Sequence, residues 1–240
     1  MAQGLARREF IEKTFSRYVD PKLAEKILSG EGGATEVTVK GQRVHAVVLF
    51  SDIRGFTRTS EKLAPEEVVG FLNDYFEQMV PAIRKNGGVI DKFIGDAVMA
   101  VWGVPYPLED APLKAVTAAI EMRDRMLKIS EKFEAMGYPK LGLCIGINMG
   151  DVIAGTLGAE KLEYTVIGDV VNTAQRGEAN AAAQQILITE VVWNAVKDHV
   201  DADAMEGRLV KGRTEPVDVR VLHVAGRPLR VSGRREYQTR

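Results

Sequence analysis

The segment GGVIDKFIGDAVMAVWG, residues 87–103, contains two apolar runs, 87–94 and 97–103, with Gly95 and Asp96 between them. Both runs have the composition of β-strands, and glycine followed by aspartate is a turn-forming pair. The segment therefore predicts a tight hairpin with a polar tip.

Three further patterns extend this hairpin into a sheet with helices. The apolar run at 44–50 predicts a strand buried on both faces, near the centre of the sheet. Residues 65–83 and about 110–136 have apolar side chains at helical spacing, and a strand-like run occupies 141–150. The order strand, helix, hairpin, helix, strand predicts an α+β fold: a ferredoxin-like split β-α-β-β-α-β sheet, mainly antiparallel, with helices on one face.

The remaining sequence predicts a C-terminal extension and two flanking segments. Strands are predicted at 152–158, 163–168 and 186–189, a helix at 169–183 and a terminal hairpin at 209–224. Two short amphipathic helices within 5–29 and a glycine-rich link make 1–36 a linker segment, so the main domain is expected at 37–225. The basic end, 226–240, is expected to be disordered.

Composition limits the function classes. The 240 residues are 45% hydrophobic with a net charge of -1, which describes a globular protein without the field that attracts nucleic acid. The single cysteine, Cys144, indicates a reducing compartment, so a cytoplasmic location is expected. No run approaches the roughly 18 apolar residues of a spanning helix, so we expect no membrane insertion. The three histidines lack zinc spacing, so oxygen would hold any metal.

Two aspartates could meet at one edge of the sheet. Asp52 follows the buried strand in VVLFSDIRGFT (47–57), and Asp96 lies at the hairpin tip. Each could instead be only a turn or capping residue. If they meet, two carboxylates repel unless a cation bridges them, and an all-oxygen site suits magnesium or manganese bound with substrate phosphates. The pair therefore suggests phosphoryl chemistry.

A polar helix face and two lysines are further candidates. In EYTVIGDVVNTAQR (163–176), Asn172 and Arg176 are four residues apart and share a helix face. An arginine there can stabilise a pentavalent phosphate and an asparagine can orient a sugar; the alternative is a solvated face. Lys92 and Lys211 could contact a substrate or be surface lysines, and the local sequence leaves both readings open.

Together these segments resemble the catalytic domain of class III adenylate and guanylate cyclases. LFSDIRGFT resembles the family's first metal-aspartate segment, DKFIGDAVMAVWG its second, and EYTVIGDVVNTAQR its ribose and transition-state helix; with LVKGR the resemblance covers about residues 43–224. It implies that 37–225 is the cyclase catalytic domain and that two such domains form a head-to-tail homodimer. It also implies that 1–36 links the domain to an upstream sensor, so we expect the chain to be a catalytic fragment of a larger protein.

The resemblance implies that each active site is shared by two subunits. Asp52, Asp96 and the backbone carbonyl of Ile53 of one subunit would hold two Mg²⁺ or Mn²⁺ ions. The other subunit would contact the nucleotide: Lys92 and Thr165 the purine, Asn172 the ribose, Arg176 the transition state and Lys211 the terminal phosphates. The implied reaction is attack of the ribose 3′-oxygen on the α-phosphate, which yields a 3′,5′-cyclic nucleotide and pyrophosphate.

The two purine contacts imply the substrate. A lysine donor at 92 and a hydroxyl acceptor at Thr165 match N1 and the 6-amino group of adenine, which favours ATP. Because a threonine hydroxyl both donates and accepts, exclusion of GTP stays open. The resemblance is to the subgroup with threonine at this position, which includes bicarbonate-responsive cyclases, so bicarbonate stimulation is a hypothesis for this chain.

Two alternatives belong to other classes. An inert cyclase-like regulatory module would have the fold without the reaction, although such modules usually lack some of the site residues that are all present here. A diguanylate cyclase or polymerase-like palm shares the split sheet and paired metal acids, but it lacks the NTAQR-type helix, and this chain has no GGDEF-like hairpin. The reaction product distinguishes all three.

Overall fold

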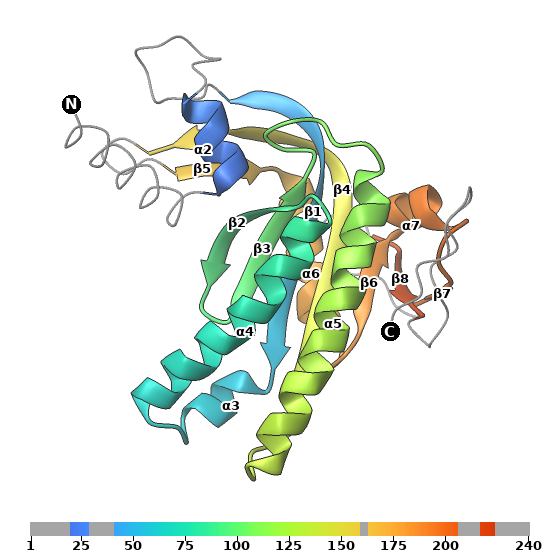
Figure 1. Ribbon diagram of the computed structural model, residues 1–240. Coiled ribbons are helices and arrows are strands. Elements are labelled where there is room, and N and C mark those ends of the chain that lie inside the picture. Colours follow the sequence, from blue (N-terminus) through green and yellow to red (C-terminus); the bar gives the residue numbers. More distant parts are fainter. Residues whose placement is uncertain (1–19, 29–40, 159–162, 206–216, 224–240) are drawn as a thin grey trace, which may run out of the picture.

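The computed structural model (Figure 1) describes residues 20–28, 41–158, 163–205 and 217–223. In these ranges the strands are β1 (Gln42–Arg54), β2 (Val89–Ile94), β3 (Ala97–Trp102), β4 (Gly142–Leu157), β5 (Glu163–Ile167), β6 (Ile186–Thr189), β7 (Ala202–Ala204) and β8 (Val219–Leu222). The helices are α2 (Pro21–Leu28), α3 (Phe56–Ser60), α4 (Pro65–Lys85), α5 (Ala111–Ala135), α6 (Asp169–Asn180) and α7 (Glu190–Val196). The described strands form one eight-stranded sheet in the order β2-β3-β1-β4-β6-β8-β7, with β5 paired to β4.

The sheet confirms the predicted split β-α-β-β-α-β core. The core elements occur along the chain in the order β1, α4, β2, β3, α5 and β4, with the short helix α3 between β1 and α4. In the sheet, β1 lies between β3 and β4 and is antiparallel to both. Val48 of β1, for example, is paired with Val101 on one side and Asn148 on the other. The chain turns from β2 to β3 through Gly95 and Asp96, where the φ of Gly95 is +64°, a value that glycine adopts without strain.

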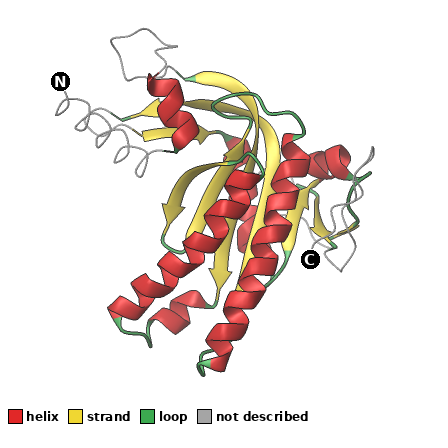
Figure 2. Cartoon of the chain, in the orientation of Figure 1, coloured by secondary structure: helices red, strands yellow, loops and turns green. Residues whose placement is uncertain are grey.

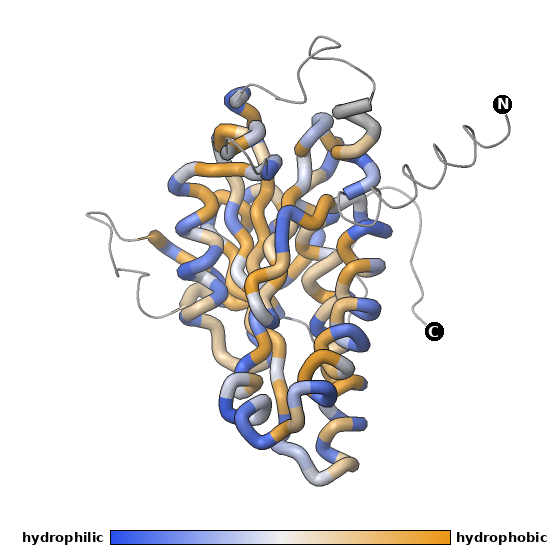
Figure 3. Tube along the Cα trace, turned by 90° about the vertical axis from the view of Figure 1, so that its left-hand side faces the viewer, coloured by the Kyte–Doolittle hydropathy of each residue, from blue (hydrophilic) through white to orange (hydrophobic). Residues whose placement is uncertain are grey.

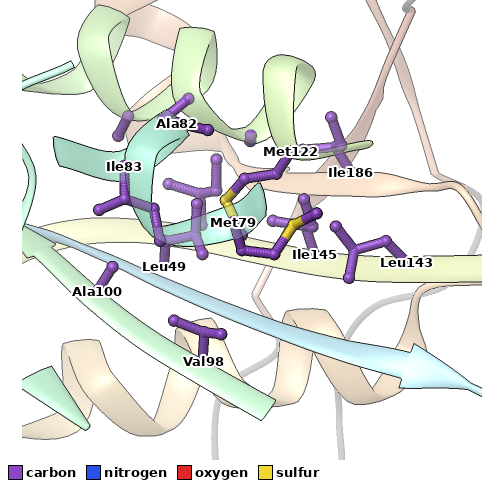
Figure 4. Close-up of a cluster of buried hydrophobic side chains, with 14 of the residues drawn as sticks. Leu49, Met79, Ala82, Ile83, Val98, Ala100, Met122, Leu143, Ile145 and Ile186 are labelled. Carbon is purple, nitrogen blue, oxygen red and sulfur yellow. The ribbon is translucent and has the colours of Figure 1, made fainter. Parts of the chain in front are cut away.

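One face of the sheet is covered by α4 and α5, which Figure 2 shows side by side. Leu49 of β1, Met79 of α4, Met122 of α5 and Ile145 of β4 meet there, almost completely shielded from water (Figure 4). Figure 3 shows apolar residues gathered along the central strands and hydrophilic residues along the outer sides of the helices. This removal of apolar surface from water is the main stabilising contribution to the fold.

The opposite face is covered by α6, the helix predicted at 169–183, whereas the prediction placed helices on one face only. Val48 and Phe50 of β1 point to this side, where Val170 and Ala174 of α6 complete a second core. Strand and helix approach so closely at Gly146 of β4 that an added Cβ would lie 2.2 Å from the carbonyl oxygen of Ala174. The two helices of the split core share one face as predicted, whereas the described sheet as a whole has helices on both.

Other differences concern boundaries and short elements. The runs predicted as separate strands at 141–150 and 152–158 form the single strand β4, because its pairing with β1 is uninterrupted. Helix α6 ends at Asn180 rather than at residue 183, because the backbone of Ala181 is extended. The elements α3, α7 and β7 were not predicted, since segments this short carry little periodicity.

Only some of the segments predicted at the two ends of the chain lie within the described residues. Helix α2 confirms the second N-terminal helix, whereas the first helix, the glycine-rich link and the tail 226–240 lie outside the described residues. So does 209–216, the first arm of the terminal hairpin, while β8 forms the second arm and pairs with β6 and β7. None of the helices in the described ranges is long and apolar enough to span a bilayer.

Candidate active site

Asp52 and Asp96 lie together where β1 meets the hairpin tip. The backbone N–H of Ile53 donates a hydrogen bond to Oδ2 of Asp96 over 3.3 Å, and the charge of Asp52 acts on the carboxyl group of Asp96. Burial, and after it the charge of Asp52, raises the pKa of Asp96 to about 6. Two carboxylates are therefore held side by side at a cost in electrostatic free energy.

This donor set fits a divalent cation bound by oxygen. The described residues contain no group of three or more His, Cys, Asp or Glu side chains that could hold a metal ion. Further ligands would therefore be backbone carbonyls such as that of Ile53, water or substrate phosphates. Magnesium and manganese suit such a shell, because magnesium keeps several waters and both metals accept carboxylate, carbonyl and phosphate oxygen.

A third carboxyl group and an arginine, neither singled out from the sequence, lie close to this pair. Glu178 of α6 is buried, and its burial together with the charge of Asp52 raises its pKa to about 7, against the opposing charge of Arg54. Arg54, the last residue of β1, donates to the carbonyl oxygens of Ala179 (3.2 Å) and Ala181 (2.6 Å) at the end of α6. These contacts tie the end of β1 that carries Asp52 to α6.

The predicted base-reading residues, Lys92 and Thr165, meet at a carboxylate that the sequence analysis did not single out. The hydroxyl of Thr165 lies 2.8 Å from Oδ2 of Asp91, and Nζ of Lys92 lies 3.5 Å from the same oxygen. Lys92 also forms an ion pair with Glu163. Burial lowers the pKa of Lys92, but the contacts with Glu163 and Asp91 outweigh burial, so the pKa lies above its ordinary value. The structure thus places lysine and threonine side by side.

A β-bulge explains why two consecutive side chains of β2 both reach β5. Ile90 pairs with Ala100 of β3 and Lys92 pairs with Met99, so Asp91 is an extra residue in the ladder. Consecutive side chains of a regular strand point to opposite faces, and a bulge re-aims one of them. The available sequence signal was an acid inside an apolar strand-like run, because a buried carboxylate requires donors.

Asn172 and Arg176 lie on α6 as predicted. The buried residues of this helix are Thr173, Ala174, Gly177 and Glu178. Asn172 is exposed and Arg176 is partly exposed, so the face that they share is turned away from the chain's own sheet. The last predicted site residue, Lys211, lies outside the described residues.

Three further residues have packing roles in the structure. Cys144 is buried in β4, and Trp102 is fully buried with its indole N–H donating to the carbonyl oxygen of Asn86 at 2.9 Å. Gly146 provides the close contact between β4 and α6. None of the three is needed to explain chemistry.

The chain belongs to the adenylate and guanylate cyclase catalytic domain family, whose family model matches residues 39–223. It is 34% identical over 224 residues to an adenylate cyclase of Anabaena cylindrica, an alignment that covers 88% of this chain and 41% of the relative. It is 33% identical over 219 residues to the terminal-differentiation specific adenylate cyclase of Dictyostelium discoideum, an alignment that covers 88% of this chain and 10% of that relative. The chain therefore spans less than half the length of these relatives.

Solved structures agree with this family. The adenylyl cyclase CyaB from P. aeruginosa has a TM-score of 0.74 and 36% identity, covering 83% of this chain and 100% of that one. The guanylyl cyclase Cya2 has a TM-score of 0.71 and 36% identity, and the match covers 78% of this chain and 96% of that one. An adenylyl and a guanylyl cyclase match with equal identity. These structures therefore identify a class III cyclase catalytic domain, but they do not show whether its nucleotide substrate carries adenine or guanine.

Proposed function

We propose that this chain is an adenylate cyclase that converts ATP to 3′,5′-cyclic AMP and pyrophosphate. The observation that carries the proposal is the meeting of Lys92 and Thr165 at one carboxylate. This places an ammonium donor beside a hydroxyl, and adenine presents an acceptor at N1 next to a donor at its 6-amino group. Guanine presents the reverse pattern, and the two curated relatives named above are adenylate cyclases.

Asp52 and Asp96, with the carbonyl of Ile53, would hold two Mg²⁺ or Mn²⁺ ions. When bound, these ions lower the pKa of the ribose 3′-hydroxyl and neutralise phosphate charge. The protein contributes position: the hydrogen bond from Ile53 to Asp96 holds the two carboxylates together before substrate arrives, so little reorganisation is left for the reaction itself.

The reaction is an in-line displacement at the α-phosphorus. The ribose 3′-oxygen attacks, the bond to the bridging oxygen of the β-phosphate breaks, and pyrophosphate leaves. Asn172 would orient the ribose, Arg176 would spread the charge of the pentavalent transition state, and Lys211 would contact the terminal phosphates. No covalent intermediate is required.

We infer that the active unit is a head-to-tail homodimer of the segment 37–225. The exposure of Asn172, on the side of α6 turned away from its own sheet, supports an arrangement in which a second chain supplies the aspartates opposite it. Segment 1–36 would connect this unit to an upstream sensor, and 226–240 would be a tail.

Two further proposals concern regulation and location. Bicarbonate stimulation rests on the resemblance at Thr165, and replacing chloride by bicarbonate at constant pH should raise the rate of cyclic AMP formation. A cytoplasmic location rests on the single cysteine, Cys144, which is buried and reduced in the described structure.

Product identification tests the proposed activity. The protein is incubated separately with ATP and with GTP in Mn²⁺, and the products are identified by mass spectrometry. We expect cyclic AMP from ATP, and none from Asp96→Ala. Asp198→Ala, which removes an exposed acid outside the proposed site, should retain wild-type activity.

The same experiment separates the alternatives. Cyclic GMP as the main product would replace the adenylate assignment by a guanylate one. A product that joins two nucleotides would indicate a diguanylate cyclase. Absence of any product at a concentration that supports dimerisation would favour the inert regulatory module.

A further inference from the structure

We propose that Asp91 determines base specificity by fixing the Thr165 hydroxyl as a hydrogen-bond acceptor toward the base, a role that rests on the proposed adenylate cyclase function. The contact is short and shielded: Oδ2 of Asp91 lies 2.8 Å from Oγ1 of Thr165, and the Asp91 side chain is only 3% exposed. Thr165 is itself 6% exposed. Water therefore competes little for this hydrogen bond.

The direction of the hydrogen bond follows from the chemistry of the two groups. An ionised carboxylate only accepts, whereas a threonine hydroxyl has one hydrogen to donate and two lone pairs. Once that hydrogen points to Asp91, the hydroxyl presents only lone pairs to a ligand. Adenine can donate its 6-amino group to them, whereas the 6-oxo group of guanine would face lone pair against lone pair. Asp91 thereby removes the ambiguity of a threonine at this position.

Three donors surround the carboxylate of Asp91. Burial raises its pKa above the ordinary value, and the hydrogen bond from Thr165, the charge of Lys92 and the backbone N–H of Val166 limit that rise. Donors thus approach the carboxylate from both β2 and β5. The bulge in β2 makes this possible, because it turns Asp91 toward β5 in addition to Lys92.

Lys92 does not depend on Asp91 alone. Its ammonium group pairs with Glu163, and its separation from Asp91 is the longer 3.5 Å. Removing the charge of Asp91 therefore leaves the lysine anchored and frees the hydroxyl of Thr165. The specificity effect of Asp91 should accordingly pass through Thr165.

The test is Asp91→Asn, assayed as the ratio of kcat/KM for ATP to kcat/KM for GTP. An amide of the same shape can donate as well as accept, so the Thr165 hydroxyl regains the freedom to donate to guanine. We expect the ratio to fall by about tenfold or more, the range of one hydrogen bond with a charged partner. Equal losses for both nucleotides would reduce Asp91 to a structural role and overturn the proposal.

A double-mutant cycle shows whether the effect passes through Thr165. In a Thr165→Val background, Asp91→Asn should leave the ratio unchanged, while Thr165→Ser alone should preserve it. A full drop in the Thr165→Val background would contradict the proposal.

Calorimetric titration with 3′-deoxy-ATP and 3′-deoxy-GTP, which cannot cyclise, gives a second readout. A preference for the adenine analogue that weakens in Asp91→Asn supports the role of Asp91, whether or not a cyclic product forms. Absence of a cyclic product would contradict only the proposed function. A preference that Asp91→Asn leaves unchanged would refute the role of Asp91 alone.

Discussion

Oδ2 of Asp96 accepts a hydrogen bond from the backbone N–H of Ile53 over 3.3 Å, which fastens the hairpin tip to the end of β1. Because Asp52 directly precedes Ile53, this contact sets two carboxyl groups next to each other. Burial and like charge then raise the pKa of Asp96 to about 6. The fold thus stores electrostatic repulsion at the place where the proposed reaction needs positive charge.

Removing one of the two charges should stabilise the metal-free protein. The pKa of Asp96 in the folded state is raised from 3.8, so its stabilising contribution is present at acid pH and is lost as the pH rises through about 6. We expect Asp52→Asn to increase the free energy of unfolding near neutral pH by about 1–2 kcal/mol. This is less than the whole pKa shift implies, because burial, its largest cause, remains in the variant and solvent screens a half-buried carboxylate. The gain should vanish near the ordinary aspartate pKa of about 4, as urea unfolding at both pH values would measure.

Asp52→Asn should stabilise the protein without metal, but it should also remove the stabilisation that a bound metal gives. Mn²⁺ should raise the Tm of the wild-type protein, because a ligand that binds only the folded state stabilises it, and should leave the Tm of Asp52→Asn nearly unchanged. Asp198→Asn, an exposed acid outside the site, should retain the full rise. Equal shifts in all three proteins would place the metal elsewhere.

Two glycines offer a matched pair of alanine substitutions. At Gly146 an added Cβ would lie 2.2 Å from backbone atoms of α6, whereas at Gly70, in the second turn of α4, an added Cβ would meet nothing within 4 Å. We expect Gly146→Ala to destabilise the fold by about 1–3 kcal/mol and to lower kcat, because it displaces the helix that carries Asn172 and Arg176. Gly70→Ala should stabilise by about 0.5–1 kcal/mol and leave kcat unchanged. Unfolding curves and steady-state rates check both, and a neutral Gly146→Ala would contradict the close packing.

Arg54 should contribute to stability and to kcat by fixing the C-terminal end of α6. Its guanidinium group donates to the carbonyl oxygens of Ala179 and Ala181, which follow the proposed catalytic face of α6. We expect Arg54→Ala to cost about 1–2 kcal/mol of stability and to lower kcat more than it changes KM. The exposed Arg58→Ala is the control and should change neither. A larger effect on KM than on kcat would mean that Arg54 acts on substrate binding instead.

The parts of this fold that the sequence could predict are those governed by local rules. The turn at Gly95 and Asp96 and the buried strand at 44–50 follow from residue type and periodicity, and both are present. The expectation that Asp52 follows this strand was wrong, because β1 stays paired with β4 through Asp52 to Arg54. The position of α6 on the opposite face could not be predicted, because it depends on the close packing at Gly146, far away in sequence.

The same division applies to the candidate site. The resemblance assigned Lys92 and Thr165 together to the purine, but the carboxylate that joins them, Asp91, is positioned by a β-bulge and by β5, 74 residues from the bulge. Glu178 acquires a raised pKa only because α6 buries it near Asp52. Such properties arise from contacts between distant segments, and no local pattern encodes them.

Shared active sites predict recovery of activity when two inactive proteins are mixed. Asp52→Ala removes a metal-binding residue and Arg176→Ala removes the transition-state arginine, so a heterodimer of the two contains one intact site. After subunit exchange at equal concentrations, half of the dimers are heterodimers, and we expect about a quarter of the wild-type rate of cyclic AMP formation. Mixing Asp52→Ala with Asp96→Ala is the matched control: both changes affect the same half of the site, so no heterodimer has an intact site and no activity should return. Absence of recovery in the first mixture despite demonstrated exchange would show that each chain builds its own site. Recovery in the control would show that the Asp52 and Asp96 of one site come from different chains.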